Sequence, residues 1–409
     1  MIDRGFFATC VLAADKLIRG VTLRFLPYFY KIDPHKLVFL NFSGNYDCNP
    51  KAICKRLLDE GADVKIVWGV YPDTPLSPGS FPPGVRTAVR ETYALYKELF
   101  TARVIVDNGV SAATLRLHKK RGQILIETWH GSLGIKKFGR DSNKDKKWLR
   151  LAEKEGRMTD FIISNSTFED AIYREDFWKE TPVWRFGHPR NDVLFCNDAK
   201  QKAALRQALN RRFGIEENAQ LCLYAPTFRD DGDLTPYTLD YDRLRKALGE
   251  RFGGEWVILT RFHRRTRMML PGLTPPAGVT DVGDYTDIQE LLLLIDVGIT
   301  DYSSWICEYM LRRSPGFIYA TDAEKYRRQD RRLFFPLEAL PFPAAYDEDG
   351  LIENILRFDG ARFRTDCDAF LTDKGSVDDG HAAERTVNEL KKLMHIENNA
   401  ANGDRKESR

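Results

Sequence analysis

The sequence lacks the cysteine spacing of a disulfide framework or a zinc site. Its seven cysteines are scattered through 409 residues, and no C-x-x-C pair occurs among them. No H-E-x-x-H or comparable spacing of metal ligands appears either. Scattered cysteines of this kind are typical of a protein in a reducing compartment, so we expect free thiols. We also expect no metal site and no tightly bound cofactor. A requirement for Mg²⁺ stays open at this point.

Two common nucleotide-binding fingerprints are also missing. No G-x-x-x-x-G-K-[ST] segment occurs, which disfavours a P-loop nucleotide hydrolase. The first expected strand is followed by Phe-Ser-Gly-Asn, whose single glycine is Gly44, and not by G-x-G-x-x-G. A dinucleotide-dependent dehydrogenase therefore loses its main support. The net charge is only +3, so the overall charge predicts no nucleic-acid partner.

No apolar run in the N-terminal region is long enough to span a bilayer. The longest there is Phe6–Ala14, and charged residues interrupt the chain beyond it. Apolar side chains still recur at helical spacing among basic ones, at Phe7, Val11, Ala14, Ile18, Val21 and Phe25, with Arg4, Lys16, Arg19 and Arg24 around them. The pattern predicts that residues 1–35 form an amphipathic helix at an anionic membrane surface. A helix docked on the body of the protein is the alternative.

Short apolar runs, often β-branched, alternate with helical stretches along most of the chain. We expect strands within residues 36–42, 63–71, 102–108, 122–129, 160–166, 181–187, 220–226, 255–262, 297–300 and 315–320. The alternation predicts an α/β protein with two doubly wound parallel sheets that face a central cleft. We assign residues 36–195 to an N-terminal domain and 196–395 to a C-terminal domain. The polar residues 396–409 are expected to be disordered.

The segment Val297–Arg313 combines a buried strand with the start of a helix. Ser303 and Ser304 lie where that helix is expected to begin, and Glu308 follows about one turn later. Backbone N–H groups at a helix start favour an anion, and serine hydroxyls add donors. Glu308 is placed to reach a ribose. The alternative is that Ser303 simply caps the helix.

Basic and hydroxyl side chains also cluster at three other places in the expected C-terminal domain. Thr227 and Arg229 come after one strand and His263 after another, with arginines clustered at 261–267 and 327–332. Such a set suits a pyrophosphate, which needs several charge-assisted hydrogen bonds. Solvent-exposed arginine is the alternative for any single member.

The segment Ile126–Asp141 places His130 at the end of a strand. A glycine-rich loop with Lys136 and Lys137 follows directly, which offers cations to a phosphate. The ordinary imidazole pKa of about 6.5 suits a general base at neutral pH. The alternative is a hydrogen-bonded core histidine, and His130 alone does not decide between them.

Five motifs, which follow one another along the chain, resemble those of a known enzyme family. They are TWHGSLGIKKFGRD, GHPRNDVL, LYAPTFRDD, DYTDIQELLLLIDVGITDYSSWICEY and YRRQDRRLFF. Together they resemble the CDP-glycerol glycerophosphotransferase family, the teichoic-acid primases and polymerases, from about Lys36 to Leu356. The resemblance implies a GT-B fold and transfer of glycerol phosphate from CDP-glycerol to a hydroxyl, with release of CMP.

The resemblance also implies roles for individual residues. His130 matches the family's catalytic base, and Ser303, Ser304 and Glu308 match its CDP site, to which we add Thr227, Arg229 and His263. Gly44, Lys136, Lys137 and Arg190 are assigned to the acceptor or a phosphate. The N-terminal domain would then face the acceptor and the C-terminal domain the donor. Family members are typically peripheral on the cytoplasmic face of the membrane, in agreement with the amphipathic start.

Some positions depart from the family pattern. His188 stands where an aromatic residue is common, WHGSLGI replaces the common WHGTPL, and Arg264 instead of proline follows His263. These departures leave a lipid-linked or polymeric acceptor, and glycerol or another polyol, as options. A GT-B glycosyltransferase that uses a nucleotide sugar is the nearest alternative. A non-catalytic membrane scaffold is a more distant one.

Overall fold

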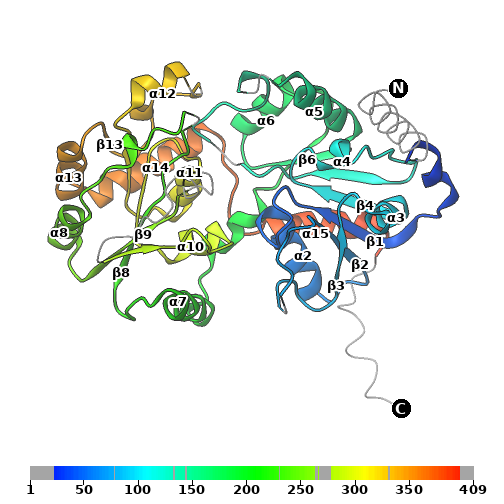
Figure 1. Ribbon diagram of the computed structural model, residues 1–409, viewed down its shortest axis with the longest axis horizontal. Coiled ribbons are helices and arrows are strands. Elements are labelled where there is room, and N and C mark those ends of the chain that lie inside the picture. The colour runs from blue at the N-terminus through cyan, green and yellow to red at the C-terminus, as the bar shows by residue number, and fades with distance from the viewer. Residues whose placement is uncertain are drawn as a thin grey trace, which may run out of the picture.

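The structure is a computed structural model that describes residues 23–77, 79–131, 134–142, 145–229, 231–262, 266, 278–329 and 332–396. Most of the predicted membrane helix and nearly all of the predicted tail lie outside these residues. Two parallel sheets form separate halves of the molecule, as the sequence predicted (Figure 1). No described helix is both long and apolar enough to cross a membrane.

The N-terminal half contains a seven-stranded parallel sheet in the order β3-β2-β1-β4-β5-β6-β7. Its strands are β1 (Asp33–Leu40), β2 (Lys65–Val70), β3 (Val85–Val89), β4 (Ala102–Asp107), β5 (Ile124–Glu127), β6 (Phe161–Ser164) and β7 (Val183–Arg185). Its helices are α2 (Cys48–Asp59), α3 (Tyr93–Thr101), α4 (Ser111–Thr114), α5 (Lys146–Met158) and α6 (Thr167–Glu175), with short 3-10 turns η1 (Leu26–Phe29), η2 (Gly139–Asp141) and η3 (Pro189–Phe195).

Strand β1 shows why these runs are apolar throughout. Val38 and Leu40 pack with α3 and α4 on one face, whereas Leu37 and Phe39 pack with α2 on the other. Helices cover both faces of a parallel sheet, so alternate side chains are all buried. The edge strand β3 was not predicted, because most of its side chains are at least partly exposed and it contains no apolar run.

The C-terminal half contains a six-stranded parallel sheet in the order β10-β9-β8-β11-β12-β13. Its strands are β8 (Gln220–Tyr224), β9 (Trp256–Thr260), β10 (Val279–Asp281), β11 (Val297–Thr300), β12 (Gly316–Tyr319) and β13 (Ala344–Ala345). The helices among the described part of residues 199–394 are α7 (Ala199–Phe213), α8 (Tyr241–Phe252), α10 (Ile288–Leu294), α11 (Trp305–Tyr309), α12 (Ala323–Gln329), α13 (Glu348–Leu356), α14 (Gly360–Asp373) and α15 (Ala382–Met394), with the 3-10 turns η4 (Thr235–Tyr237), η5 (Met310–Arg312) and η6 (Leu337–Ala339).

Helix α15 lies with the N-terminal half, although its residues fall in the range that we assigned to the C-terminal domain. Val387, Leu390 and Met394 pack into the same core cluster as Leu37 and Phe39. Figure 1 shows α15 beside α2 and the first strands. Periodicity predicts a helix here, but it carries no information about which sheet the helix covers.

Candidate active site

A cavity of about 1050 Å³ is lined by residues from both halves of the molecule. The lining includes eight residues that were predicted as site residues: His130, Lys136, Lys137, Arg190, Thr227, Ser303, Ser304 and Glu308. Strands β5, β8 and β11 precede most of them, and parallel strands present their carboxyl ends at one edge of a sheet. The cavity is therefore the candidate active site.

His130 follows β5 and its imidazole is held in one orientation. Nδ1 lies 2.6 Å from the backbone oxygen of Asn108, which follows β4. A carbonyl oxygen only accepts hydrogen bonds, so Nδ1 carries the proton and Nε2 presents a lone pair. The ring stacks on Phe42, with 4.5 Å between ring centroids. This tautomer leaves Nε2 able to accept a proton.

Burial also sets the charge of His130. It lowers the pKa of the imidazole to about 4, a shift that the Asn108 carbonyl opposes and the nearby Arg190 cation reinforces. The ring is consequently neutral at physiological pH. Because its side chain lines the cavity and is not sealed in the core, the structure favours a base over a core histidine.

The backbone next to His130 is unusual. Trp129 has a φ of +50°, a left-handed conformation that residues other than glycine rarely adopt. Its ring packs against Phe138 and Trp178, at centroid distances of 5.3 and 5.5 Å. Such strain persists only where the surrounding contacts impose it, and it is often found at functional sites.

The side chains of Arg190 and Glu308 are paired with each other. The guanidinium of Arg190, in η3, forms an ion pair with Oε1 of Glu308, in α11. Another nitrogen of Arg190 donates to the backbone oxygen of His130 at 2.8 Å, and Gln289 donates to Oε2 of Glu308. The sequence analysis assigned Arg190 to the acceptor or a phosphate, and Glu308 to a ribose. In this structure both side chains already have protein partners.

Ser303 and Ser304 line the cavity just before α11. Ser304 is the N-cap residue, yet its side chain makes no capping hydrogen bond. Neither serine is fully buried. The hydroxyl of Ser304 therefore makes no capping hydrogen bond to the helix, and both side chains lie at the cavity surface.

The basic loop after His130 is tied to the C-terminal half. The backbone N–H of Lys137 donates to the oxygen of Arg332, and that of Phe334 donates to Ile135, both at 2.9 Å. Lys136 Nζ lies 3.5 Å from Thr227 Oγ1. Two of the family-like motifs thus pair directly, and they place Lys136 beside Thr227 of the C-terminal half.

Of the other three predicted site residues, two do not line the cavity and one lies outside the described residues. Arg229 is 2% exposed and forms ion pairs with Asp301 and Asp322, so its charge is already compensated. Gly44 has a φ of +76° in a turn, where an added Cβ would lie 2.7 Å from Tyr71, and it does not line the cavity. His263 lies outside the described residues. A strand-end position predicts proximity to the site but does not say which way a long side chain turns.

Residues that the sequence reasoning missed complete the site. Phe42 and Asn108 support the His130 ring, and Gln289 supports Glu308. Phe42 and Asn108 each end an expected strand, so their positions at the sheet edge were a usable signal. Gln289 carries no comparable signal, because amide side chains occur everywhere in the chain.

Three buried carboxyl groups, those of Asp107, Glu127 and Glu155, adjoin the His130 loop. Their potential ligand atoms lie within 4.8 Å of one another. Burial raises the pKa of Asp107 to about 6 and lifts the pKa values of both glutamates well above their usual range. None of the three lines the cavity, and Glu127 accepts a hydrogen bond from the Trp129 N–H at 2.7 Å. We infer that the three carboxyl groups support the His130 loop.

The fold and the site together define a class of protein. Two doubly wound parallel sheets with a cavity between the halves are the architecture of a GT-B-like transferase. A solved structure of the wall teichoic acid polymerase TagF aligns with a TM-score of 0.78 and 26% identity, over 97% of this chain and 99% of that chain.

Sequence comparison identifies the family. The profile described as CDP-glycerol:poly(glycerophosphate) glycerophosphotransferase matches residues 22–392, and the chain belongs to this family of enzymes. The teichoic acid poly(glycerol phosphate) polymerases of Staphylococcus epidermidis and Bacillus subtilis are 31% and 26% identical, each over 86% of this chain. The chain spans 50% and 48% of those two proteins. A teichoic acid glycerol-phosphate transferase of Staphylococcus aureus is 26% identical, over 85% of this chain and 91% of that protein.

Proposed function

We propose that this protein transfers glycerol phosphate from CDP-glycerol to a hydroxyl of a polymeric or lipid-linked acceptor and releases CMP. The observation that carries the proposal is the neutral His130, whose Nε2 lone pair is free at a cavity shared with Ser303 and Ser304. Family membership supports the donor, and a TagF variant has been soaked with CDPG.

In the reaction, Nε2 of His130 removes the proton of the acceptor hydroxyl. The acceptor oxygen forms a bond to the glycerol-bearing phosphorus as the bond between that phosphorus and the CMP oxygen breaks. A base of this kind typically contributes about 10²–10⁴-fold to the rate. The Asn108 carbonyl accepts from Nδ1–H and stabilises the imidazolium that forms.

On the donor side, the hydroxyls of Ser303, Ser304 and Thr227 donate to the diphosphate. Lys136 adds a positive charge beside Thr227, which offsets the charge that develops on the departing CMP. Arg190 donates twice to Oε1 of Glu308, whereas Oε2 accepts from Gln289, so a lone pair of Oε2 can accept from a ribose hydroxyl while the ion pair stays in place.

We also propose that the N-terminal segment holds the enzyme on the cytoplasmic face of the membrane. At its described end, Phe25, Tyr28 and Phe29 are 57%, 71% and 83% exposed. Leu23 is buried and Leu26 packs beside it in the N-terminal core. The segment thus presents aromatic side chains outward while it is anchored to the fold, which suits an interfacial position.

Incubation with a panel of CDP-alcohols and nucleotide sugars tests the function. We expect CMP release with CDP-glycerol, together with phosphate transfer to a glycerol-phosphate oligomer. Release of a nucleoside diphosphate from a nucleotide sugar would instead establish a glycosyltransferase. Absence of turnover with every CDP-alcohol would refute the proposal.

A further inference from the structure

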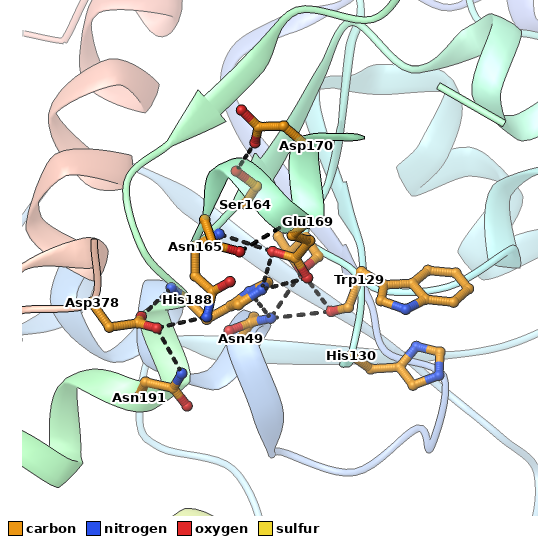
Figure 2. Close-up of polar contacts among 12 residues, drawn as sticks. Asn49, Trp129, His130, Ser164, Asn165, Glu169, Asp170, His188, Asn191 and Asp378 are labelled. Carbon is orange, nitrogen blue, oxygen red and sulfur yellow. Dashed lines mark hydrogen bonds and ion pairs between the residues drawn. The ribbon is translucent and has the colours of Figure 1, made fainter. Parts of the chain in front are cut away.

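Asn49, a fully buried side chain in the first turn of α2, contacts the loop that carries the proposed base. Its amide nitrogen donates to the backbone oxygens of Thr128 and Trp129 at 3.0 and 3.1 Å. Its amide oxygen accepts from the backbone N–H of Arg190 at 3.0 Å. Figure 2 shows Asn49 between His188 and this loop.

These partners fix the orientation of the amide. Two carbonyl oxygens require N–H donors, and a backbone N–H requires an acceptor, so the reversed amide would lose every one of these hydrogen bonds. The next carbonyl, that of His130, is held by the Arg190 guanidinium at 2.8 Å. Three consecutive carbonyls are therefore fixed, which holds Trp129 in its left-handed conformation and sets the direction of His130.

His188 supports the amide from the other side. Its Nδ1 lies 3.3 Å from the Asn49 nitrogen, and its Nε2 lies 2.9 Å from Oε2 of Glu169. The Asn49 nitrogen carries two hydrogens, which the Thr128 and Trp129 carbonyls accept, so Nδ1 of His188 shares one of them as a third and longer acceptor. The proton of His188 then sits on Nε2, facing the carboxylate. The His188 backbone N–H donates to Asp378 at 2.8 Å, so the contact reaches the chain that returns before α15.

We propose that Asn49 is the positioning residue of the base loop and that His188 orients its amide. This inference rests on the proposed function, since it takes His130 as the base. A positioning error of about 1 Å near the reacting atoms can cost on the order of 10²-fold in rate. Without the Asn49 donors, the Thr128 carbonyl loses its contact with α2, and the Trp129 carbonyl keeps only the Thr128 hydroxyl at 3.2 Å. The backbone that directs the imidazole is then less firmly held.

The test compares Asn49→Ser with Asn191→Ser. Asn191 is equally buried and hydrogen-bonds to Asp378 at 3.4 Å, but it does not contact the base loop, so it is the matched control. We expect Asn49→Ser to lower kcat about 10²-fold with an almost unchanged KM for CDP-glycerol. Asn191→Ser should destabilise the fold and keep kcat close to the wild-type value. Equal losses of kcat in the two folded variants would overturn the proposal.

Asn49→Asp provides a second variant of nearly identical shape. It keeps the acceptor for the Arg190 N–H and loses both donors, so we expect the same fall in kcat as in Asn49→Ser. Wild-type turnover in Asn49→Asp would overturn the proposal even if Asn49→Ser fails to fold.

A readout without substrate separates this inference from the proposed function. Nitrogen-15 NMR of the imidazoles, assigned with His130→Gln, should show His130 in its Nδ1–H form in the wild type and in Asn191→Ser. We expect a mixture of tautomers in Asn49→Ser. Failure of the wild type to use CDP-glycerol would refute the function alone, whereas an unchanged His130 signal in Asn49→Ser would refute the positioning role.

Discussion

Arg190 and Glu308 join the two halves of the molecule at the wall of the cavity. Arg190 precedes the C-terminal sheet in the chain and lies against the His130 loop, whereas Glu308 belongs to α11 of the C-terminal half. Their side chains are 12% and 2% exposed. The pair thus links the His130 loop to the C-terminal half, and it is buried enough for its loss to be measurable.

Arg190→Met should destabilise the protein by about 3–5 kcal/mol, because it leaves the buried carboxylate of Glu308 without its cation. Urea unfolding measures the effect. The double variant Arg190→Met with Glu308→Leu is the control, and it should regain most of the loss, since no buried charge remains. A single variant within about 1 kcal/mol of the wild type would contradict the pairing.

His130→Gln should reduce turnover by about 10²–10⁴-fold while the fold and the affinity for CDP are retained. Stopped assays of CMP release and calorimetric titration with CDP supply the two measurements. His35→Ala is a suitable control, because His35 hydrogen-bonds to the Asp63 backbone and does not line the cavity. Near wild-type turnover in His130→Gln would remove His130 from the mechanism.

The pH dependence follows from the lowered pKa of His130. The neutral ring is the active form, and it predominates above the pKa of about 4 that burial produces. The rate constant kcat/KM, which reports the free enzyme, should therefore stay flat as the pH falls from 8 to about 5.5. An acid limb centred near the ordinary value of about 6.5 would show that the imidazole is more accessible to water than the structure indicates.

Ser303→Ala with Ser304→Ala should weaken binding of CDP. Each lost hydrogen bond to a charged group costs about 1.5–3 kcal/mol, which calorimetry resolves easily. Ser142→Ala is the matched control, since Ser142 lines the same cavity from the N-terminal half. Unchanged affinity in the double variant would mean that the nucleotide binds in another part of the cavity.

Replacement of Phe25, Tyr28 and Phe29 by serine should reduce sedimentation with anionic vesicles and leave transfer to a soluble acceptor intact. These side chains are exposed, so their loss removes apolar contact with the headgroup region without opening the core. Leu76→Ser, at another exposed apolar position, is the control. Unaltered sedimentation of the triple variant would place membrane contact on another surface.

Much of the fold could be predicted because buried parallel strands are apolar throughout. Strands β1, β4, β8 and β11 lie within or close to the expected ranges. The edge strands β3, β10 and β13 were missed, since none of them contains a long apolar run, and most side chains of β3 are at least partly exposed. Edge strands are specified by a neighbouring strand more than by their own composition.

The sequence by itself determined the two sheets, the order of the family motifs and the chemical groups available to the cavity. These are local properties, fixed by apolar periodicity and by the residue types that end each strand. Only the tertiary structure decided the tautomer of His130, the pairing of Arg190 with Glu308 and the place of Asn49. Each depends on which strand ends meet and on how deeply they are buried, and contacts between residues 22 to 139 positions apart leave no periodic signal in the chain.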